Sequence, residues 1–376
     1  MNEIADLIHQ LEVSADNPAQ AIHKAMEETG KKAIGCFPIY TPEELVYAAG
    51  MLPVGMWGGQ AKGQLADRYL QGFCCSLMRA NTEQVLMGKY DFLSGVIMTT
   101  FCDTLKCVVE NWKTSSPQLN IIPMVYPQNR KITTGKEFLR DEFLRVKEEL
   151  EKITRIRISD RALEESVDIY DVYRKTMQEF VELAPFYPTL ISPKSRHLII
   201  KAAYFMDKKI YTDKIKELIV LLKRLPQEKT RKKRIILTGL IGEPNGLLEI
   251  LAENEMIVVA DDLAQESRQF RTIAPREGDA LARMVERISL QDGCAFLFDE
   301  AKSRGQMLID MKNRYQADGV IICQLKFCDP EEFDYPIIKK ELEAAEIPSL
   351  YIEIEQQMDS VEQLRTRVQS FSEILA

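Results

Sequence analysis

The sequence predicts an α/β protein with two doubly wound, mostly parallel-sheet domains and a helical segment between them. In the second half, short apolar runs alternate regularly with amphipathic stretches of helical length, which is typical of parallel strands joined by crossover helices. The first 130 residues show the same alternation less regularly. In between, residues 133–225 carry three long stretches with helical spacing and dense charge on one face. These stretches predict the helical segment.

The length of the chain fits two domains. It has 376 residues, enough for two domains of ordinary size. Three prolines within residues 183–195 interrupt the helical pattern. We therefore expect an N-terminal α/β domain with a helical extension at residues 1–190, and a C-terminal α/β domain at residues 191–376.

Charge and hydropathy exclude some classes of partner. The net charge of −8 argues against general nucleic-acid binding, because phosphate contacts need a basic surface. No apolar run approaches the 18 residues of a membrane-spanning helix. The first residues, MNEIADLIHQLEV, are acidic and amphipathic and lack the pattern of a signal peptide. We therefore expect no membrane partner and a cytoplasmic location.

The first half is predicted to contain four strands and several helices. One helix begins at Thr41-Pro42-Glu43-Glu44, where Thr41 is the expected N-cap and Glu44 its capping-box partner. The predicted strands are residues 31–40, 52–55, 96–98 and 119–127. The predicted helices are residues 2–29, 41–50, 76–88 and 103–112.

The chain after about residue 130 is predicted to begin with long helices and to continue with alternating strands and helices. The long helices are residues 134–153, 159–183 and 208–225. The predicted strands are residues 234–240, 256–262, 295–298, 319–323 and 348–355. The predicted helices between and after them are residues 242–254, 278–289, 303–315, 333–345 and 360–375.

Three cysteines stand where an open α/β sheet places ligands. Two Phe-Cys-Asp stretches follow strands in the two halves and place Cys102 and Cys328, and Cys75 lies at the start of a helix. Loops at the carboxyl ends of parallel strands cluster, so these thiols should lie close together.

Two interpretations of the cysteines are open at this point. All eight cysteines of the chain can be small buried hydrophobes. Alternatively, three of them bind an iron–sulfur cluster, which takes thiolate ligands. Structural zinc is less favoured, because the chain has no C-x2-C pair. The C-x4-C pairs Cys102/Cys107 and Cys323/Cys328 each have one member expected to face the core.

The loop DDLAQESRQFR, residues 261–271, also has two interpretations. The aspartates can cap a helix, and the two arginines of the loop, Arg268 and Arg271, can pair with Glu266 or with interdomain carboxylates. The alternative is an arginine clamp on phosphate or carboxylate groups of a ligand. Caps and ion pairs within the chain are commoner, so we expect a structural role for this loop.

Six separated motifs extend from about residue 30 to the C-terminal part. They are GKKAIGCFPIYTPEELVYAAGMLPVGMWGG, FCCS, TTFCDTLK, YPQNR, VVADDLAQESRQFR and FCDPEEFDYP. In this order the motifs resemble the 2-hydroxyacyl-CoA dehydratases, and in particular their smaller, β-type iron–sulfur subunit.

The resemblance implies a fold and a cofactor. Each subunit of this family has two α/β domains with a [4Fe–4S] cluster at their interface. Carried onto this sequence, the cluster ligands are Cys75, Cys102 and Cys328. Cys74 is the alternative to Cys75, which is preferred because it directly precedes Ser76 at the helix start.

The resemblance also implies an activity and partners. The family removes water from (R)-2-hydroxyacyl-CoA to give (E)-2-enoyl-CoA through a ketyl radical anion formed by one electron. A separate ATP-dependent iron–sulfur activator supplies this electron. A β subunit forms a heterodimer with a homologous larger α subunit, which holds most of the acyl-CoA substrate. This chain would then relay the electron and carry no acid–base residues of its own.

Two other functions are considered beside this one. The first is a subunit of a benzoyl-CoA-type reductase, or a stand-alone cluster reductase. The second is a non-catalytic two-domain protein that binds a small acidic ligand through residues 261–271 and has structural cysteines.

Overall fold

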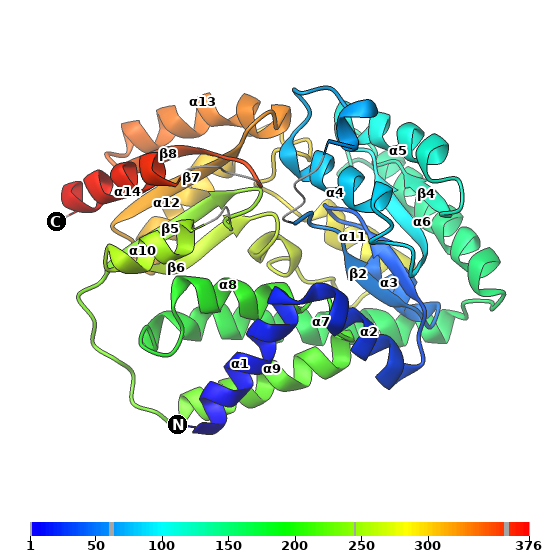
Figure 1. Cartoon of the computed structure of the whole chain (residues 1–376), viewed down its shortest axis with the longest axis horizontal. Coiled ribbons are helices and arrows are strands. Elements are labelled where there is room, and N and C mark those ends of the chain that lie inside the picture. The colour runs from blue at the N-terminus through cyan, green and yellow to red at the C-terminus, as the bar shows by residue number, and fades with distance from the viewer. Residues whose placement is uncertain (1, 60–63, 244–245, 357–360, 376) are drawn as a thin grey trace.

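The computed structural model describes residues 2–59, 64–243, 246–356 and 361–375, and its framework is two four-stranded sheets (Figure 1). The strand orders are β2-β1-β3-β4 and β6-β5-β7-β8. All pairs of neighbouring strands are parallel, which confirms the predicted α/β class. The strands are β1 Ala33–Cys36, β2 Leu52–Gly55, β3 Leu93–Thr99, β4 Ile121–Met124, β5 Lys233–Gly239, β6 Met256–Leu263, β7 Gly319–Leu325 and β8 Ser349–Ile354.

Both sheets are doubly wound around a central pair of strands. The chain goes from β1 outward to β2 and then returns to the other side of β1 as β3; β5, β6 and β7 repeat this path. Each sheet therefore has a switch point, between β1 and β3 in one and between β5 and β7 in the other. Strands β1, β2, β6 and β7 are buried along their whole length, as expected for parallel strands with both faces covered.

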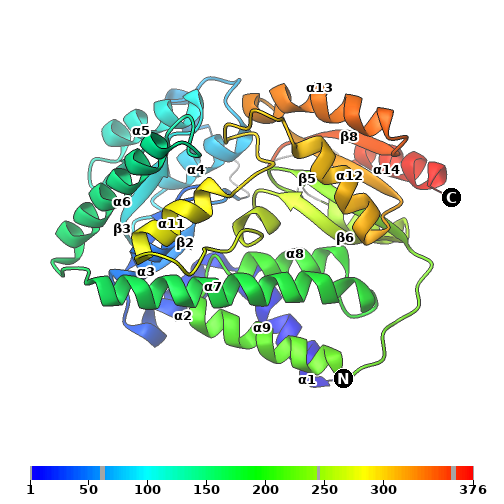
Figure 2. The ribbon, with the colours of Figure 1, turned by 180° about the vertical axis from the view of Figure 1, so that it is seen from behind.

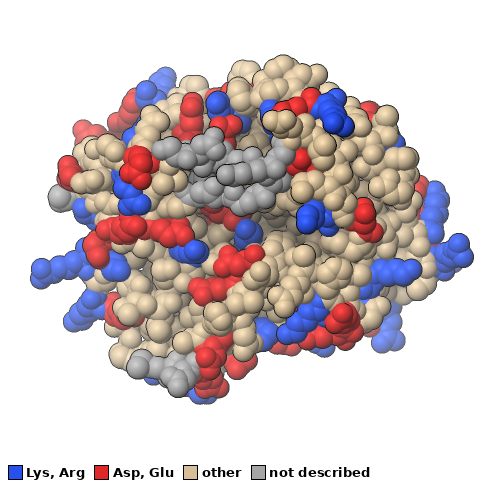
Figure 3. All heavy atoms as spheres, viewed as in Figure 1, with Lys and Arg blue, Asp and Glu red and all other residues tan. Residues whose placement is uncertain are grey.

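Helices cover the sheets and confirm most of the predicted positions. None of the helices in the described part of the chain is both long and apolar enough to cross a membrane. Basic and acidic side chains are interspersed over the face shown in Figure 3. The helices are α1 Asn2–Asp16, α2 Pro18–Thr29, α3 Glu43–Ala48, α4 Ser76–Leu86, α5 Asp103–Ser115, α6 Thr133–Thr154, α7 Asp160–Leu183, α8 Pro193–Ala202, α9 Lys208–Lys223, α10 Leu247–Glu253, α11 Ala280–Ser289, α12 Arg304–Tyr315, α13 Asp329–Ala344 and α14 Glu362–Ile374.

Four helices form a layer with its own apolar core. Helix α1 packs against α8 and α9, and α7 packs against α9. Their shared core includes Leu11, Phe180, Tyr211 and Leu218, all fully buried. Figure 1 shows this layer below both sheets. The helical segment was predicted, whereas the division between the domains at residue 190 stays a prediction.

The segment between β6 and β7 crosses back onto the first half of the chain. Its helix α11 packs against α6 and α7 (Figure 2). Arg130, 1% exposed, fixes this segment from the N-terminal side. Its guanidinium donates hydrogen bonds to the carbonyl oxygens of Ile288 (2.8 Å), Phe298 (2.6 Å) and Gln291. A charged donor shared by three carbonyls of this segment holds the two halves together.

The prediction of a strand at residues 295–298 is wrong. These residues form turns in the crossing segment and pair with neither sheet. The carbonyl of Phe298 accepts its hydrogen bond from Arg130, so a long-range side-chain contact takes the place of a strand partner.

The predicted capping box at Thr41 is also wrong. Helix α3 has Pro42 at its N-cap without a side-chain hydrogen bond. The hydroxyl of Thr41 donates instead to the carbonyl of Phe37, at 2.6 Å. Glu44, 1% exposed, is bound by Arg174. Leaving either of these buried charges unpaired would cost more than the loss of one cap hydrogen bond.

Replacing Arg130 by Met should lower the free energy of unfolding by roughly 3 kcal/mol, because two buried carbonyls and the part-buried carbonyl of Phe298 lose a charged donor. Urea unfolding of the full chain measures this change. The matched control is Arg140→Met. Arg140 is 39% exposed in its side chain and pairs with Asp279 at the edge of the same segment, so its loss should cost at most about 1 kcal/mol. Equal unfolding midpoints for the two variants would contradict the assigned role of Arg130.

Candidate functional site

The three cysteines predicted as ligands occupy equivalent positions, each at the N-cap of a helix. Cys75 precedes α4, Cys102 precedes α5 and Cys328 precedes α13. Cys102 follows β3, and Cys328 follows β7, so each stands next to the switch point of its own sheet. A helix N-terminus presents free N–H groups and the positive end of the helix dipole. This local geometry favours a thiolate at all three positions.

The same three thiols line one pocket between the two halves of the chain. Its walls also include Pro38 and Ile39, which follow β1, and Leu240, which follows β5. Both switch points therefore open on the same pocket, as the rule for ligand sites in doubly wound sheets requires. The lining residues are Pro38, Ile39, Trp57, Cys75, Leu77, Met78, Cys102, Thr104, Leu105, Leu240, Phe296, Phe327, Cys328, Asp329 and Pro330.

The walls of the pocket are mostly apolar, and this raises the pKa of each thiol. Burial raises the pKa of Cys75 to about 12. Burial also raises the pKa of Cys102, although its Sγ accepts a hydrogen bond from the backbone N–H of Leu105 at 3.5 Å. For Cys328, burial and then the charge of Glu331 raise the pKa well above its usual value. A cation bound among these thiols would reverse this balance and favour the thiolates.

The other cysteines do not line this pocket. Cys74 does not line the pocket and is adjacent to Thr104 and Cys107. The predicted choice of Cys75 over Cys74 therefore agrees with the positions of the two side chains. Cys107 is exposed, Cys36 and Cys323 are buried within strands β1 and β7, and Cys294 is buried beside Arg268.

Some lining residues were not predicted from the sequence. Trp57 and Leu240 lie just beyond β2 and β5, so the position of each after a strand was a usable signal. Phe296 belongs to the crossing segment and reaches the pocket from between β6 and β7. No local pattern marks this residue, because its place depends on the contact of the segment with the N-terminal half.

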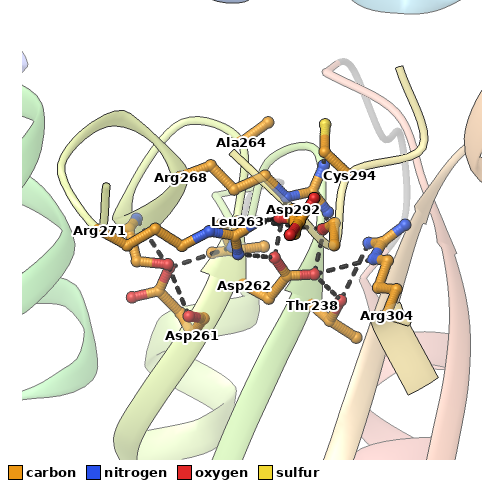
Figure 4. A network of polar contacts seen from close by, with 12 residues as sticks. Thr238, Asp261, Asp262, Leu263, Ala264, Arg268, Arg271, Asp292, Cys294 and Arg304 are labelled. Carbon is orange, nitrogen blue, oxygen red and sulfur yellow. Dashed lines mark hydrogen bonds and ion pairs between the residues drawn. The ribbon is translucent and has the colours of Figure 1, made fainter. Parts of the chain in front are cut away.

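An ionic network lies under the C-terminal side of the pocket (Figure 4). Asp262, at the end of β6, is fully buried and accepts hydrogen bonds from Arg268 at 2.9 and 3.1 Å. It also binds Arg304 at 2.8 Å and Arg271 at 2.5 Å. Burial alone would raise the pKa of this carboxyl, but the three guanidinium groups hold it well below its usual range. Glu331 joins the network through Arg268 at 3.0 Å and Arg304 at 2.7 Å.

These contacts decide the role of residues 261–271. The arginines pair with carboxylates of the chain, which confirms the structural role. The prediction that these arginines pair with Glu266 was wrong, because Glu266 binds Arg196 and His197. Asp261 and Asp262 lie within strand β6, directly before its last residue, Leu263, and are not helix caps. A ligand clamp is not supported, because Nε, Nη1 and Nη2 of Arg268 are all engaged within the protein.

A second buried network connects helix α8 to the C-terminal sheet. His197 lies between Glu266 at 2.9 Å and Glu243 at 2.9 Å. Burial lowers the pKa of His197, but the two carboxylates outweigh it and raise the pKa to about 9. The imidazole is therefore protonated at neutral pH and acts as a structural cation.

Comparison with known proteins identifies the family. The model of the 2-hydroxyglutaryl-CoA dehydratase D-component matches residues 38–375. The chain is 45% identical over 360 residues, or 96% of both chains, to the (R)-phenyllactyl-CoA dehydratase beta subunit of Clostridium sporogenes. It is 43% identical over 377 residues, covering all of both chains, to the lactoyl-CoA dehydratase subunit beta of Anaerotignum propionicum. It is 34% identical to the (R)-2-hydroxyglutaryl-CoA dehydratase subunit beta of Acidaminococcus fermentans, over 99% of this chain and 100% of the relative.

The family model covers most of the chain, and these three relatives match it over nearly their full length. The resemblance seen in the sequence motifs is thereby confirmed, and the chain belongs to the 2-hydroxyglutaryl-CoA dehydratase D-component family.

Proposed function

We propose that this chain is the β subunit of an (R)-2-hydroxyacyl-CoA dehydratase and that Cys75, Cys102 and Cys328 hold a [4Fe–4S] cluster in it. One observation carries the proposal: three thiols from both halves of the chain line the same apolar pocket. The relatives named as dehydratase beta subunits supply the class of reaction.

The donor set fits a cluster better than a single metal ion. In the ranges that the structure describes, no group of three or more His, Cys, Asp or Glu side chains is arranged to hold one metal ion. The three thiols instead surround a pocket. A cluster needs such an arrangement, because each thiolate binds a different iron. The fourth ligand is not assigned to a residue.

The chain's own residues would hold and shield this group. Each thiolate would lie at a helix N-terminus, where the helix dipole and free N–H groups offset part of its negative charge. Trp57, Leu240 and Phe296 give the pocket apolar walls. When bound, the cluster supplies one-electron transfer.

The pocket is poorly equipped for acid–base chemistry, which favours an electron relay. Among the lining residues that the structure describes, Asp329 is the only one with a carboxylate, and none is a His, Lys or Arg. A reaction that removes water needs groups that move protons. We therefore propose that the acyl-CoA substrate binds mainly to a homologous larger α subunit.

The remaining partners follow from the same proposal. An ATP-dependent iron–sulfur activator would supply the electron, and the ketyl radical anion would form on the substrate at the α subunit. The assembly would be a heterodimer in the cytoplasm. The beta-subunit names of the relatives support a second, different subunit.

Anaerobic purification of the chain should yield about four irons and four sulfides per chain and a broad visible absorption band. Iron and sulfide analysis, with an absorption spectrum, measures this. Fully folded protein that takes up no iron under reconstitution would contradict the proposed cofactor.

Replacing Cys75, Cys102 or Cys328 by Ser should abolish the stable cluster, because each change removes one of three thiolate ligands. Iron content and the visible band report the loss. Cys74→Ser is the matched control, since Cys74 is the neighbour of Cys75 in sequence but does not line the pocket. Loss of iron in Cys74→Ser with retention in Cys75→Ser would reverse the assignment.

Co-expression with a homologous α subunit should give a complex that dehydrates an (R)-2-hydroxyacyl-CoA when activator, ATP and reductant are present. The chain alone should show no activity, because the substrate site would lie on the partner. Detection of the 2-enoyl-CoA product measures the reaction. Reduction of an aromatic acyl-CoA without dehydration would favour a reductase of the same superfamily.

A further inference from the structure

We propose that Glu331, held by Arg268 and Arg304, is a positioning residue for Cys328 and that its buried negative charge keeps the reduction potential of the bound cluster low. The inference rests on the proposed function, because it requires a cluster in the pocket. It goes further by assigning an electrostatic role to residues that do not line the pocket.

Glu331 is fixed directly behind Cys328. It occupies the third position of α13, the helix that Cys328 caps, and its backbone N–H faces the Cys328 thiol and lowers its pKa. The side chain is 4% exposed. Its Oε1 binds Nη1 of Arg268 at 3.0 Å, and its Oε2 binds Nη1 of Arg304 at 2.7 Å. Both oxygens of the Glu331 carboxylate are bound by arginines, and these contacts fix the first turn of α13 against the C-terminal sheet.

The two arginines are held in turn by the end of the C-terminal sheet. Asp262 of β6 accepts from Nε of both, at 2.9 Å from Arg268 and 2.8 Å from Arg304. Thr238 of β5 accepts from Nη2 of Arg304 at 3.0 Å. A continuous chain of contacts therefore runs from strands β5 and β6 through Glu331 to the position of Cys328.

The other cysteines have no equivalent buried charge behind them. Asp103 opens helix α5 directly after Cys102, but its side chain is 93% exposed and pairs with Lys106 on the surface. Water screens such a charge strongly. The first turn of α4, after Cys75, contains no acidic residue. The electrostatic environment of the pocket is therefore asymmetric: of the three helices that begin at these cysteines, α13 alone has a buried carboxylate in its described first turn.

The charges of the network explain why Glu331 matters for the potential. Asp262 and Glu331 balance Arg268 and Arg304, and all four residues are buried. At the edge of the network, the partly exposed Arg271 and Asp334 add one charge of each sign. Reduction adds one electron from a one-electron donor to the cluster, and no bond forms or breaks. A buried negative charge nearby makes this step less favourable. Removal of the Glu331 charge would leave the pocket facing an excess of positive charge.

The test is a redox titration of the reconstituted, full-length chain, with dithionite as reductant and the visible band as readout. Glu331→Gln keeps the shape of the side chain and removes its charge. We expect the ratio of reduced to oxidised cluster at a fixed solution potential to rise at least tenfold, or about 59 mV for a one-electron couple. Glu331→Asp keeps the charge and should stay close to the wild-type potential.

A charge control lies one helical turn further along α13. Asp334→Asn removes a carboxylate that contacts the same Arg304 at 3.4 Å and is 15% exposed in its side chain. Its effect on the ratio should be at most about threefold, because the charge is further from Cys328 and more exposed. Arg304→Gln reverses the sign of the charge change and should lower the ratio. This second variant carries the test if Glu331→Gln does not fold.

The outcomes separate this inference from the proposed function. Wild-type protein that binds no iron overturns both. If the wild-type protein holds a cluster, two results overturn the electrostatic role alone. One is an unchanged reduction potential in Glu331→Gln. The other is a shift of the potential in the same direction in Arg304→Gln and Glu331→Gln. A shift in Asp334→Asn as large as that in Glu331→Gln also overturns it.

Discussion

Burial of three thiols at the junction of two sheets is the constraint on which the rest of the structure depends. A thiol in an apolar pocket is neutral at physiological pH, and burial raises the pKa of Cys75, Cys102 and Cys328 alike. A thiolate in the same place needs compensation. The fold provides part of it by placing each cysteine at a helix N-terminus. The parallel sheets make this possible, because strand ends and helix starts meet at the same edge.

The buried ions follow from the same geometry. Charges inside a protein are costly unless they are paired and hydrogen-bonded. Asp262 and Glu331 therefore occur with Arg268 and Arg304, and each carboxylate contacts both guanidinium groups. Such a network contributes little net stability compared with apolar packing. Its value lies in fixed geometry and a fixed field beside the pocket, which a hydrophobic cluster would not provide.

The sequence predicted the positions of residues that depend on local pattern. Strand ends, helix starts and the two Phe-Cys-Asp stretches located Cys102 and Cys328, and the family motifs added Cys75. Local pattern failed where a distant side chain decided the outcome. Glu44 matched a capping box but binds Arg174, 130 residues away. Residues 295–298 matched a strand but form turns, and the carbonyl of Phe298 binds Arg130. Arg304 and Glu331 gave no local signal, because only the folded sheet brings both to Asp262.

The asymmetry of the pocket connects fold and proposed role. The N-terminal half contributes two cysteines whose helix starts carry no buried acid, and the C-terminal half contributes one cysteine backed by a charged network. A substrate site would need groups that move protons at the pocket surface, whereas Asp262, Glu331, Arg268 and Arg304 do not line the pocket. Glu331 does not line the pocket, yet its charge adds to burial in raising the pKa of the Cys328 thiol. The proposed electron relay would use this arrangement to set the reduction potential of the cluster.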